Sequence, residues 1–235
     1  RLYSGKKQRP GGDSSRFGIL LRYPTTGLFR AHATPDFIIA CRTRVLNRYK
    51  KAMYNKKPSD PLQGLRVVEL AGVLAGPSVG LFFAELGADV LKVENKTTGG
   101  DVTRRWKLPE EKGEALFSAY YACVNQGKRT VLFDLRDPAD FAQVEEAIAS
   151  ADIVISNFRE DAARKLRLDY GTLSRQFPRL IYGQITGFGP EDPRPAFDVV
   201  LQAEAGFLDL TGEPGGNPVK MPVALIDLLA AHQLK

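Results

Sequence analysis

Asp227 is the residue whose surroundings most clearly indicate chemistry. It is the only Asp, Glu, Lys or Arg between Lys220 and Lys235, and leucine or isoleucine flanks it on both sides. An ionised carboxylate in apolar surroundings raises the free energy of the folded state unless it has a partner. Two interpretations follow: a reactive carboxylate, or a buried aspartate that caps a neighbouring loop. The residues alone favour the second.

Four further segments combine small or turn-forming residues with polar ones. After Leu70 the chain reads Ala-Gly-Val-Leu-Ala-Gly-Pro, which lets a ligand approach the backbone and the start of a following helix. Leu74 and Pro77 stand where a GxGxxG fingerprint requires glycine, which disfavours NAD binding. The other segments are Asn95 with Gly99-Gly100-Asp101 and Arg104, then Asn157-Phe158, then Thr186-Gly187-Phe188-Gly189-Pro190.

Each of these segments also has an ordinary structural interpretation. An asparagine after a strand often forms an Asx-turn, and a phenylalanine usually belongs to the core. Gly187 and Gly189 are also typical of a tight turn. For Asn157 and Phe158, the position directly after a predicted strand favours contact with a ligand.

The elements that must position these segments alternate between strands and helices. We predict strands over residues 65–70, 89–94, 130–135, 153–155 and 180–185, and helices over 77–86, 137–150, 160–167 and 170–177. Asp137 and Pro138 are typical of a helix start. The pattern predicts an α/β fold, with an open, mostly parallel, Rossmann-like sheet and helices on both faces. Ligands of such sheets bind beyond the carboxyl ends of the strands, where the four segments lie.

The net charge of +6 is unevenly distributed along the 235 residues. Residues 1–60 hold 14 Lys and Arg against 3 Asp and Glu, whereas residues 61–235 hold 19 against 24. The acidic balance of the second part argues against a nucleic-acid partner. The apolar runs are far shorter than the ~18 residues of a membrane-spanning helix, so we expect no membrane partner. Two cysteines, Cys41 and Cys123, give no disulfide framework, and no His or Cys pair has metal-ligand spacing.

Residues 1–60 are therefore interpreted as a basic, poorly ordered extension, and residues 61–235 as the folded part. The extension lacks a sustained period of 2 or 3.6 residues. Its Arg-rich, acid-poor composition suits an organelle transit peptide. The alternative is that Met53 is the true start and that the residues before it are upstream sequence. We expect a cytoplasmic protein, or a mitochondrial one if the extension is a transit peptide.

Taken together, the motifs resemble the class III coenzyme A transferase family, whose members include formyl-CoA transferase and carnitine CoA-transferase. The resemblance extends from Leu62 to the last residue. Each segment is weak alone, but the order and spacing of the set are specific: 62–70, 75–77, 86–94, Gly100-Asp101 with Arg104, Asn125 with Lys128-Arg129, Asn157-Phe158, 178–182, 186–189, Asp198 and 223–227.

The resemblance implies transfer of CoA from an acyl-CoA donor to a carboxylic acid through covalent intermediates on Asp227. In the family mechanism this carboxylate attacks the thioester to give a mixed anhydride. CoA thiolate then returns to form an aspartyl-CoA thioester, and the acceptor acid takes over the CoA. The resemblance thus reverses the preference for a capping role. On a helix, Val223, Ala224, Ala230 and Ala231 share the face of Asp227 and are small enough for a thioester to come close.

The resemblance also implies a CoA site, with CoA and acyl-CoA as substrates and no tightly bound cofactor or metal. Arg104, Lys128, Arg129 and Lys165 are the cations expected to meet the CoA phosphates, although a single Lys or Arg is more often a solvated charge. The chain departs from formyl-CoA transferase at Asn95 and Thr186, where that enzyme has cations, and at Leu74, where it has glutamine. The full predicted set is Val73, Leu74, Ala75, Asn95, Arg104, Asn125, Lys128, Arg129, Asn157, Phe158, Lys165, Thr186, Gly187 and Phe188.

Two alternatives stay open. An α-methylacyl-CoA racemase, which has the same fold, needs a second proton-transferring group, usually a histidine before the aspartate of Phe197-Asp198. Phe197 cannot transfer a proton, and His232 is expected to be an exposed helix residue. The other alternative is an inactive fragment, because family members are longer, form interlocked homodimers and add a second, smaller domain that is missing after Lys235. The apolar side of the last helix is then expected to lack partners.

Overall fold

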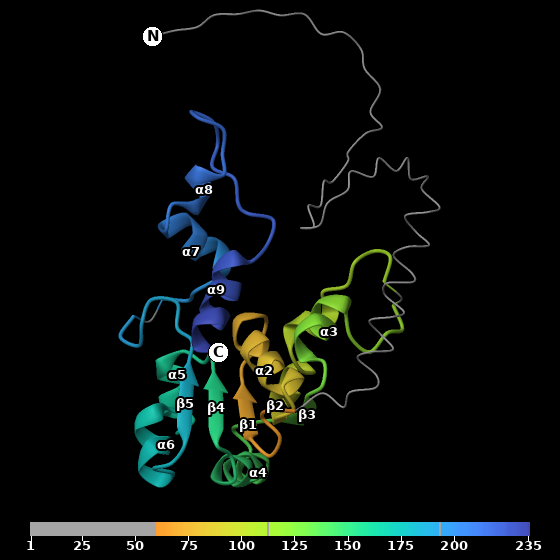
Figure 1. The fold of residues 1–235 in the computed structure, drawn as a ribbon, viewed down its shortest axis with the longest axis vertical. Helices are drawn as coiled ribbons and strands as arrows, with labels where there is room; N and C mark the ends of the chain where they lie inside the picture. Colours follow the sequence, from red (N-terminus) through yellow and green to blue (C-terminus); the bar gives the residue numbers. More distant parts are fainter. Residues whose placement is uncertain (1–59, 112, 193) are drawn as a thin grey trace, which may run out of the picture. The chain divides into compact units, whose positions relative to one another are not determined.

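The structure, a computed structural model, describes residues 60–111, 113–192 and 194–235. Apart from Asp60, the predicted extension over residues 1–60 lies outside the described residues. The described part contains a five-stranded sheet with strand order β3-β2-β1-β4-β5 (Figure 1). Its strands are β1 (Arg66–Leu70), β2 (Asp89–Asn95), β3 (Arg129–Phe133), β4 (Ile153–Ser156) and β5 (Ile181–Gln184). All four pairings are parallel, which confirms the predicted α/β sheet.

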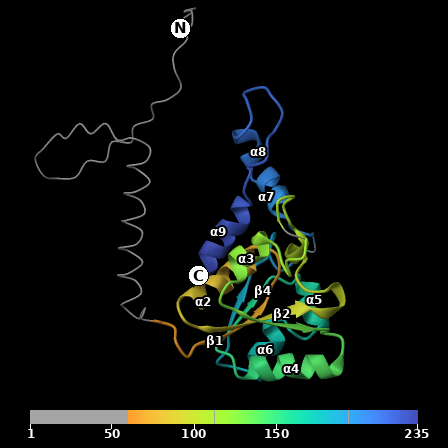
Figure 2. The same ribbon diagram turned by 90° about the vertical axis from the view of Figure 1, so that its right-hand side faces the viewer.

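Helices cover both faces of this sheet (Figure 2). On one face lie α2 (Ala75–Glu85) and α9 (Leu225–Leu234), with α3 (Ala119–Asn125) packed against α2. On the other face lie α4 (Pro138–Ala149) and α6 (Tyr170–Gln176). The connections contain η1 (Lys96–Thr98), η2 (Val102–Arg105), α5 (Glu160–Lys165), α7 (Asp198–Glu204) and α8 (Phe207–Leu210). Figure 1 shows α7 and α8 beyond the carboxyl ends of the strands.

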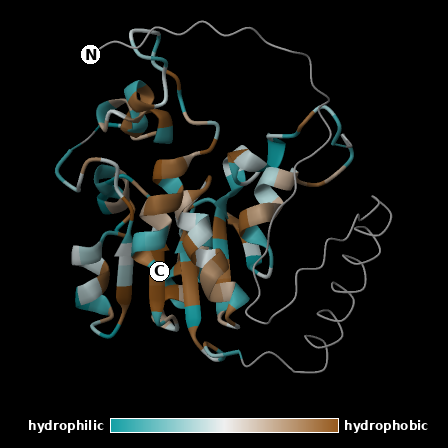
Figure 3. Ribbon diagram, turned by 45° about the horizontal axis from the view of Figure 1, so that its top comes forward, coloured by the Kyte–Doolittle hydropathy of each residue, from teal (hydrophilic) through white to brown (hydrophobic). Residues whose placement is uncertain are grey.

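Alternation along the strands decides which helix each side chain meets. Val68 of β1 packs with Val144 and Ile148 of α4, whereas its neighbour Val67 packs with Val79 of α2. Because helices cover both faces, β1 and β4 are hydrophobic along most of their length, and brown segments are visible in the sheet in Figure 3. The carboxyl ends of these strands are thereby held at one edge of the sheet.

The helix starts follow local sequence signals only in part. As predicted, Asp137 caps α4, and its carboxylate accepts the backbone N–H groups of Ala139 (2.9 Å) and Asp140 (3.0 Å). Helix α2 begins at Ala75, two residues earlier than predicted, without a side-chain cap. At α9 the N-cap residue, Ala224, has no side chain that can cap it. The free N–H groups at the start of α9 must find acceptors elsewhere.

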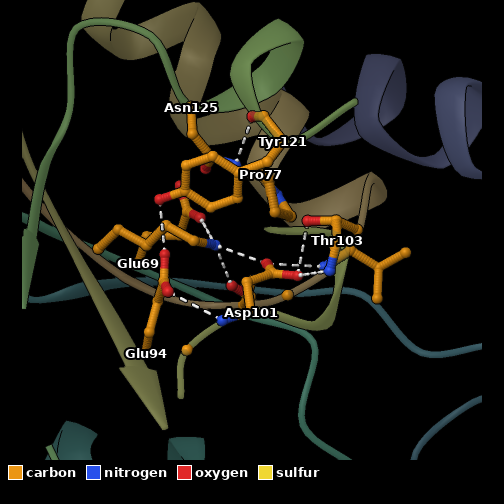
Figure 4. Close-up of polar contacts among 12 residues, drawn as sticks. Glu69, Pro77, Glu94, Asp101, Thr103, Tyr121 and Asn125 are labelled. Carbon is orange, nitrogen blue, oxygen red and sulfur yellow. Dashed lines mark hydrogen bonds and ion pairs between the residues drawn. The ribbon is translucent and has the colours of Figure 1, made fainter. Parts of the chain in front are cut away.

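A buried ionic network lies between the sheet and α2 (Figure 4). Lys92 Nζ on β2 donates to Glu69 Oε1 on β1 (2.8 Å) and to the Ala71 carbonyl (2.7 Å), and lies 3.3 Å from Asp101 Oδ2. Lys128 Nζ lies 2.7 Å from the other oxygen of Glu69. The side chains of Lys92, Glu69 and Lys128 are fully buried. Each of these charges therefore depends on its partners rather than on water.

A second cluster joins the network at the end of β2. Glu94 accepts hydrogen bonds from Arg104 Nε (2.7 Å), the Asp101 N–H (2.8 Å) and the Tyr121 hydroxyl (2.6 Å). The Arg104 guanidinium also stacks 4.0 Å from the centre of the Tyr121 ring. These bonds hold the pKa of Glu94 below its usual value, against the effect of burial. The loop after β2 is thus tied to the sheet through the Glu94 carboxylate.

Replacing Glu69 with glutamine tests the dependence of the fold on this network. Glu69→Gln keeps the size of the side chain but leaves Lys92 and Lys128 without their shared counter-ion, so we expect a loss of about 3–5 kcal/mol in the free energy of unfolding. Urea denaturation measures it. The matched control is Asp89→Asn, which breaks the exposed Arg129–Asp89 pair and should cost at most ~1 kcal/mol. Equal losses in the two variants would contradict the prediction.

Candidate functional site at the carboxyl edge of the sheet

Two cavities that share several residues lie beyond the carboxyl ends of the strands. The first, of about 510 Å³, is lined by six predicted CoA-site residues and by the predicted nucleophile: Ala75, Asn157, Phe158, Thr186, Gly187, Phe188 and Asp227. The second, of about 450 Å³, shares Ala75, Asn157 and Asp227 with the first and adds Val73 and Leu74. Asp227 therefore faces both cavities, and the structure brings most of the predicted site residues together around it.

A third cavity, of about 500 Å³, lies at the ends of β1, β2 and β3. Of the predicted residues it contains Val73, Asn95 and Phe158. It also contains Arg136, which the sequence analysis missed. Val73 belongs to the second and third cavities, and Phe158 to the first and third. The loop after β1 and the end of β4 therefore connect all three.

The loop after β1 is held from two sides in an unfavourable conformation. Val73 has φ 69°, in the left-handed region that β-branched residues avoid. Its N–H donates to Asp101 Oδ2 (3.1 Å), and Asn157 binds both the N–H (3.1 Å) and the carbonyl (2.9 Å) of Gly72. The Asn157 amide thus bridges the ends of β1 and β4 rather than forming a local Asx-turn. This bridge fixes the backbone that separates the cavities.

Asp227 lies in the first turn of α9, half-buried. None of the described residues donates a hydrogen bond to its carboxylate. Burial, and secondarily the nearby negative charge of Asp198, raise the pKa of Asp227 from 3.8 to about 6. A carboxylate of this kind is ionised at neutral pH but is more basic than an ordinary one, as a nucleophile or general base requires.

Asp198 provides the N-terminal cap of α9, the helix that carries Asp227. Its Oδ1 accepts the N–H groups of Ile226 (2.7 Å) and Asp227 (3.2 Å) at the start of α9. From the sequence, Asp198 was identified only as part of a motif. The absence of a capping side chain at Ala224 was a signal that a distant acceptor had to exist.

Tyr120 is a second residue that the sequence analysis missed. It lines the second cavity together with Asp227 and packs edge-on against Trp106, with 5.2 Å between ring centroids. Burial, and secondarily the charge of Asp227, raise the pKa of the Tyr120 hydroxyl. Tyr120 therefore stays protonated at neutral pH and is available as a hydrogen-bond donor.

The predicted cations are placed less favourably for binding phosphates. Arg104 is bound to Glu94, and Lys128 is buried, where its Nζ donates to the Pro77 carbonyl (2.8 Å) and lies beside Glu69. Burial lowers the pKa of Lys128 to about 8, against the opposing effect of Glu69. In this arrangement both side chains form ion pairs with buried carboxylates of the protein, Arg104 with Glu94 and Lys128 with Glu69.

Arg129 and Lys165 lie away from the cavities. Arg129 begins β3 at the amino edge of the sheet, where it forms two hydrogen bonds of 2.8 Å with Asp89. Lys165 ends α5 with an exposed side chain, 4.0 Å from Asp161. A parallel sheet places the start of every strand opposite its ligand-binding edge, which explains the position of Arg129.

The two remaining predicted asparagines have structural partners. Asn125 is buried; its amide donates to the Tyr121 carbonyl (2.9 Å), and its oxygen accepts from Lys128 (3.0 Å). The Asn95 side chain caps η1 by accepting the N–H of Thr97 (2.9 Å). Asn95 nevertheless lines the third cavity, whereas Asn125 lines none of the three.

Two classes of feature are absent among the residues that the structure describes. No cluster of His, Cys, Asp and Glu there has the arrangement of a metal site. Over the same residues, no helix combines the length and apolar character that crossing a membrane requires.

Comparisons with known proteins agree with the resemblance noted in the sequence. A solved structure of a CAIB/BAIF family protein from Brucella suis is 41% identical, with a TM-score of 0.65 over 74% of this chain and 48% of that one. The succinate–glutarate CoA-transferase of Agrobacterium fabrum is 47% identical over 182 residues, which are 75% of this chain and 45% of the relative. The human succinyl-CoA:glutarate CoA-transferase is 34% identical over 72% of this chain and 38% of its own length.

The chain thus spans about half the length of the curated relatives it matches. The family model described as CoA-transferase family III matches residues 62–234. Because this match covers well over half of the chain, the chain belongs to CoA-transferase family III.

Proposed function

We propose that this chain carries the nucleophile and much of the CoA site of an enzyme that transfers CoA from an acyl-CoA donor to a carboxylic acid. The observation that carries the proposal is Asp227, a half-buried carboxylate with a raised pKa that faces two cavities at the carboxyl edge of the sheet. Membership of the CoA-transferase family gives this carboxylate a substrate.

The proposed chemistry begins with attack of an Asp227 oxygen on the thioester carbonyl carbon. The C–S bond breaks, CoA leaves as a thiolate, and a mixed anhydride remains on Asp227. The thiolate then attacks the aspartyl carbonyl and releases the donor acid, and the acceptor carboxylate removes the CoA by the reverse sequence. The raised pKa supports this role, since a more basic carboxylate is a better nucleophile once ionised.

The cavities suggest how CoA lies on the chain. We place the nucleotide end in the third cavity, which is lined by the backbone after β2 and by Arg136, whose exposed side chain pairs with Asp134 (3.1 Å) rather than with a buried carboxylate. The pantetheine arm then follows the loop at residues 72–75, whose small side chains permit close approach. The thioester reaches Asp227 in the shared part of the other two cavities. The predicted contacts of Val73, Leu74, Ala75, Asn95, Asn157 and Phe158 are kept in this proposal.

The substrates that we propose are dicarboxylic. The two curated relatives named above are named for succinate or succinyl-CoA and glutarate. Arg159 and Arg194, which pair with neighbouring carboxylates, also line the first cavity, to which Asp227 belongs. A guanidinium binds a carboxylate with two hydrogen bonds, which suits the distal carboxylate of such an acid. The predicted interlocked homodimer remains a prediction.

A racemase requires a second proton-transferring group, usually a histidine. Among the described residues, no histidine lines the two cavities that contain Asp227. Phe197 lines both cavities that contain Asp227, at the place where a racemase needs histidine. His232 is exposed in the last turn of α9. Incubating an α-methylacyl-CoA in deuterated water without an acceptor acid separates the two functions, because only a racemase exchanges the α-proton.

Asp227→Asn should reduce CoA transfer at least about a thousandfold, since the amide cannot form the anhydride. Chromatographic detection of glutaryl-CoA formed from succinyl-CoA and glutarate measures the rate. Asp209→Asn, which changes an exposed aspartate of α8, is the matched control and should retain full activity. Turnover retained by Asp227→Asn would contradict the assignment, and a wild-type chain without turnover would favour the inactive-fragment alternative.

The same substitution should stabilise the folded chain at neutral pH. The pKa of Asp227 rises from 3.8 to about 6 on folding, so between these values the folded state binds more protons, and its stability falls as pH rises. At pH 7.5 we expect Asp227→Asn to gain about 1–2 kcal/mol over the wild type, after allowance for partial exposure.

Urea denaturation at several pH values measures this gain. It should shrink as the pH falls from 6 towards 4 and vanish below 4, because the wild-type carboxyl is then protonated. Asp209→Asn should show no such dependence. A gain that is independent of pH would show that the charge of Asp227 is not its source.

Arg136→Ala should weaken CoA binding about five- to tenfold, if Arg136 meets a phosphate in the third cavity. Isothermal titration with CoA measures the dissociation constant. Arg129→Ala removes the same side chain from the amino edge of the sheet and should change the affinity less than about twofold. A larger effect of Arg129→Ala than of Arg136→Ala would refute the proposed path of CoA.

A further inference from the structure

Helix α9 receives its N-terminal cap from a different helix. Asp198 Oδ1, on α7, accepts the N–H groups of Ile226 and Asp227 at 2.7 and 3.2 Å. These N–H groups would otherwise stabilise a negative charge on Asp227 itself, since the first turn of a helix favours anions. The cap therefore positions Asp227 and at the same time withholds a stabilising interaction from its carboxylate.

Asp198 is itself held in place by a buried amide. Its other oxygen accepts a hydrogen bond from Gln202 Nε2, one turn further along α7. Gln202 is 1% exposed, and its Oε1 accepts the N–H of Met221 (3.0 Å) while its Nε2 lies 3.3 Å from the Val223 carbonyl. Through Asp198 and Gln202, α7 therefore forms hydrogen bonds both with the first turn of α9 and with the segment just before it. Figure 1 shows the two helices next to each other.

These hydrogen bonds bring a second carboxylate, that of Asp198, beside Asp227. The other charged or titratable groups that line the same two cavities mostly occur as oppositely charged neighbours. They are Arg194, which pairs with Asp192 and Glu204, Arg159, which pairs with Asp161, Glu160, which pairs with Arg164, and in addition Lys220 and Tyr120. On α9 itself the remaining titratable group is the exposed His232. Burial raises the pKa of Asp227, and the negative charge of Asp198 raises it further.

We propose that Asp198 is a positioning residue that holds Asp227 at the start of α9 and whose charge favours conversion of the Asp227 carboxylate into a neutral acyl derivative. The inference rests on the proposed function. When an Asp227 oxygen bonds to the acyl carbon and the C–S bond breaks, the electron pair leaves with sulfur. The negative charge thereby moves from a site beside Asp198 to the CoA thiolate, which relieves the repulsion between the two carboxylates.

Asp198→Asn separates the charge from the cap, because asparagine keeps an oxygen that can accept the two N–H groups. The titration midpoint of Asp227 is followed by the ¹³C shift of its carboxyl carbon in aspartate-labelled full chain, assigned with Asp227→Asn. We expect the midpoint to fall from about 6 by roughly half a unit or more. On mixing with succinyl-CoA, the fraction of chain that carries a covalent adduct by mass spectrometry should fall at least about twofold.

Asp198→Glu is the matched variant, since it keeps the charge but moves the carboxylate by one methylene group. Its midpoint should stay near 6, whereas hydrogen-exchange protection of the Ile226 and Asp227 amides should fall. This variant keeps the inference testable if Asp198→Asn does not fold. A midpoint well below 6 in Asp198→Glu, or unchanged amide protection, would overturn the inference.

The outcomes separate this inference from the proposed function. An unchanged midpoint in Asp198→Asn overturns the role of Asp198 even if the wild type transfers CoA. An unchanged adduct fraction with a lowered midpoint overturns the link to acylation. If the wild type forms no covalent adduct at all while the midpoint falls as expected, the proposed function fails and the electrostatic coupling stands.

Discussion

The buried charge of Lys92 is the constraint on which the carboxyl edge of the sheet depends. An ammonium group cannot remain in the interior without counter-ions and acceptors. Lys92 obtains them from Glu69 on β1, the Ala71 carbonyl after β1 and Asp101 after β2. The same Asp101 receives the N–H of Val73 and holds its strained backbone. Satisfying one lysine therefore determines the path of two loops that line the cavities.

The need to satisfy buried polar groups also explains how the remaining loops are placed. Asn157 binds both the backbone N–H and the backbone carbonyl of Gly72, and Asp198 accepts the unpaired N–H groups of α9. In each case the partner comes from a distant part of the chain. The edge of the sheet is consequently a set of cross-linked loops, and such a set can hold a reactive group in one geometry.

Asp227 stands out because the chain leaves its carboxylate without a donor among the described residues, although nearly every other buried carboxylate there has one. The folded state bears the cost of that charge, which appears as a pKa of about 6. Charge left unsatisfied in this way is typical of functional sites, where stability is given up for reactivity. By contrast, the positive charges of Arg104 and Lys128 are paired with the buried carboxylates of Glu94 and Glu69.

Sequence patterns predicted the mostly parallel α/β sheet, its strands to within two residues, and the edge where Val73, Asn157 and Phe158 lie, whereas the family resemblance assigned Asp227 to the site. Periodicity and helix caps are local, so the order of residues is enough to reveal them. Packing in three dimensions places Lys128 in the interior and Arg129 at the opposite edge, and it makes Asp198 the cap of α9. Those outcomes depend on hydrogen bonds and ion pairs between residues far apart in the chain, which sequence spacing does not encode.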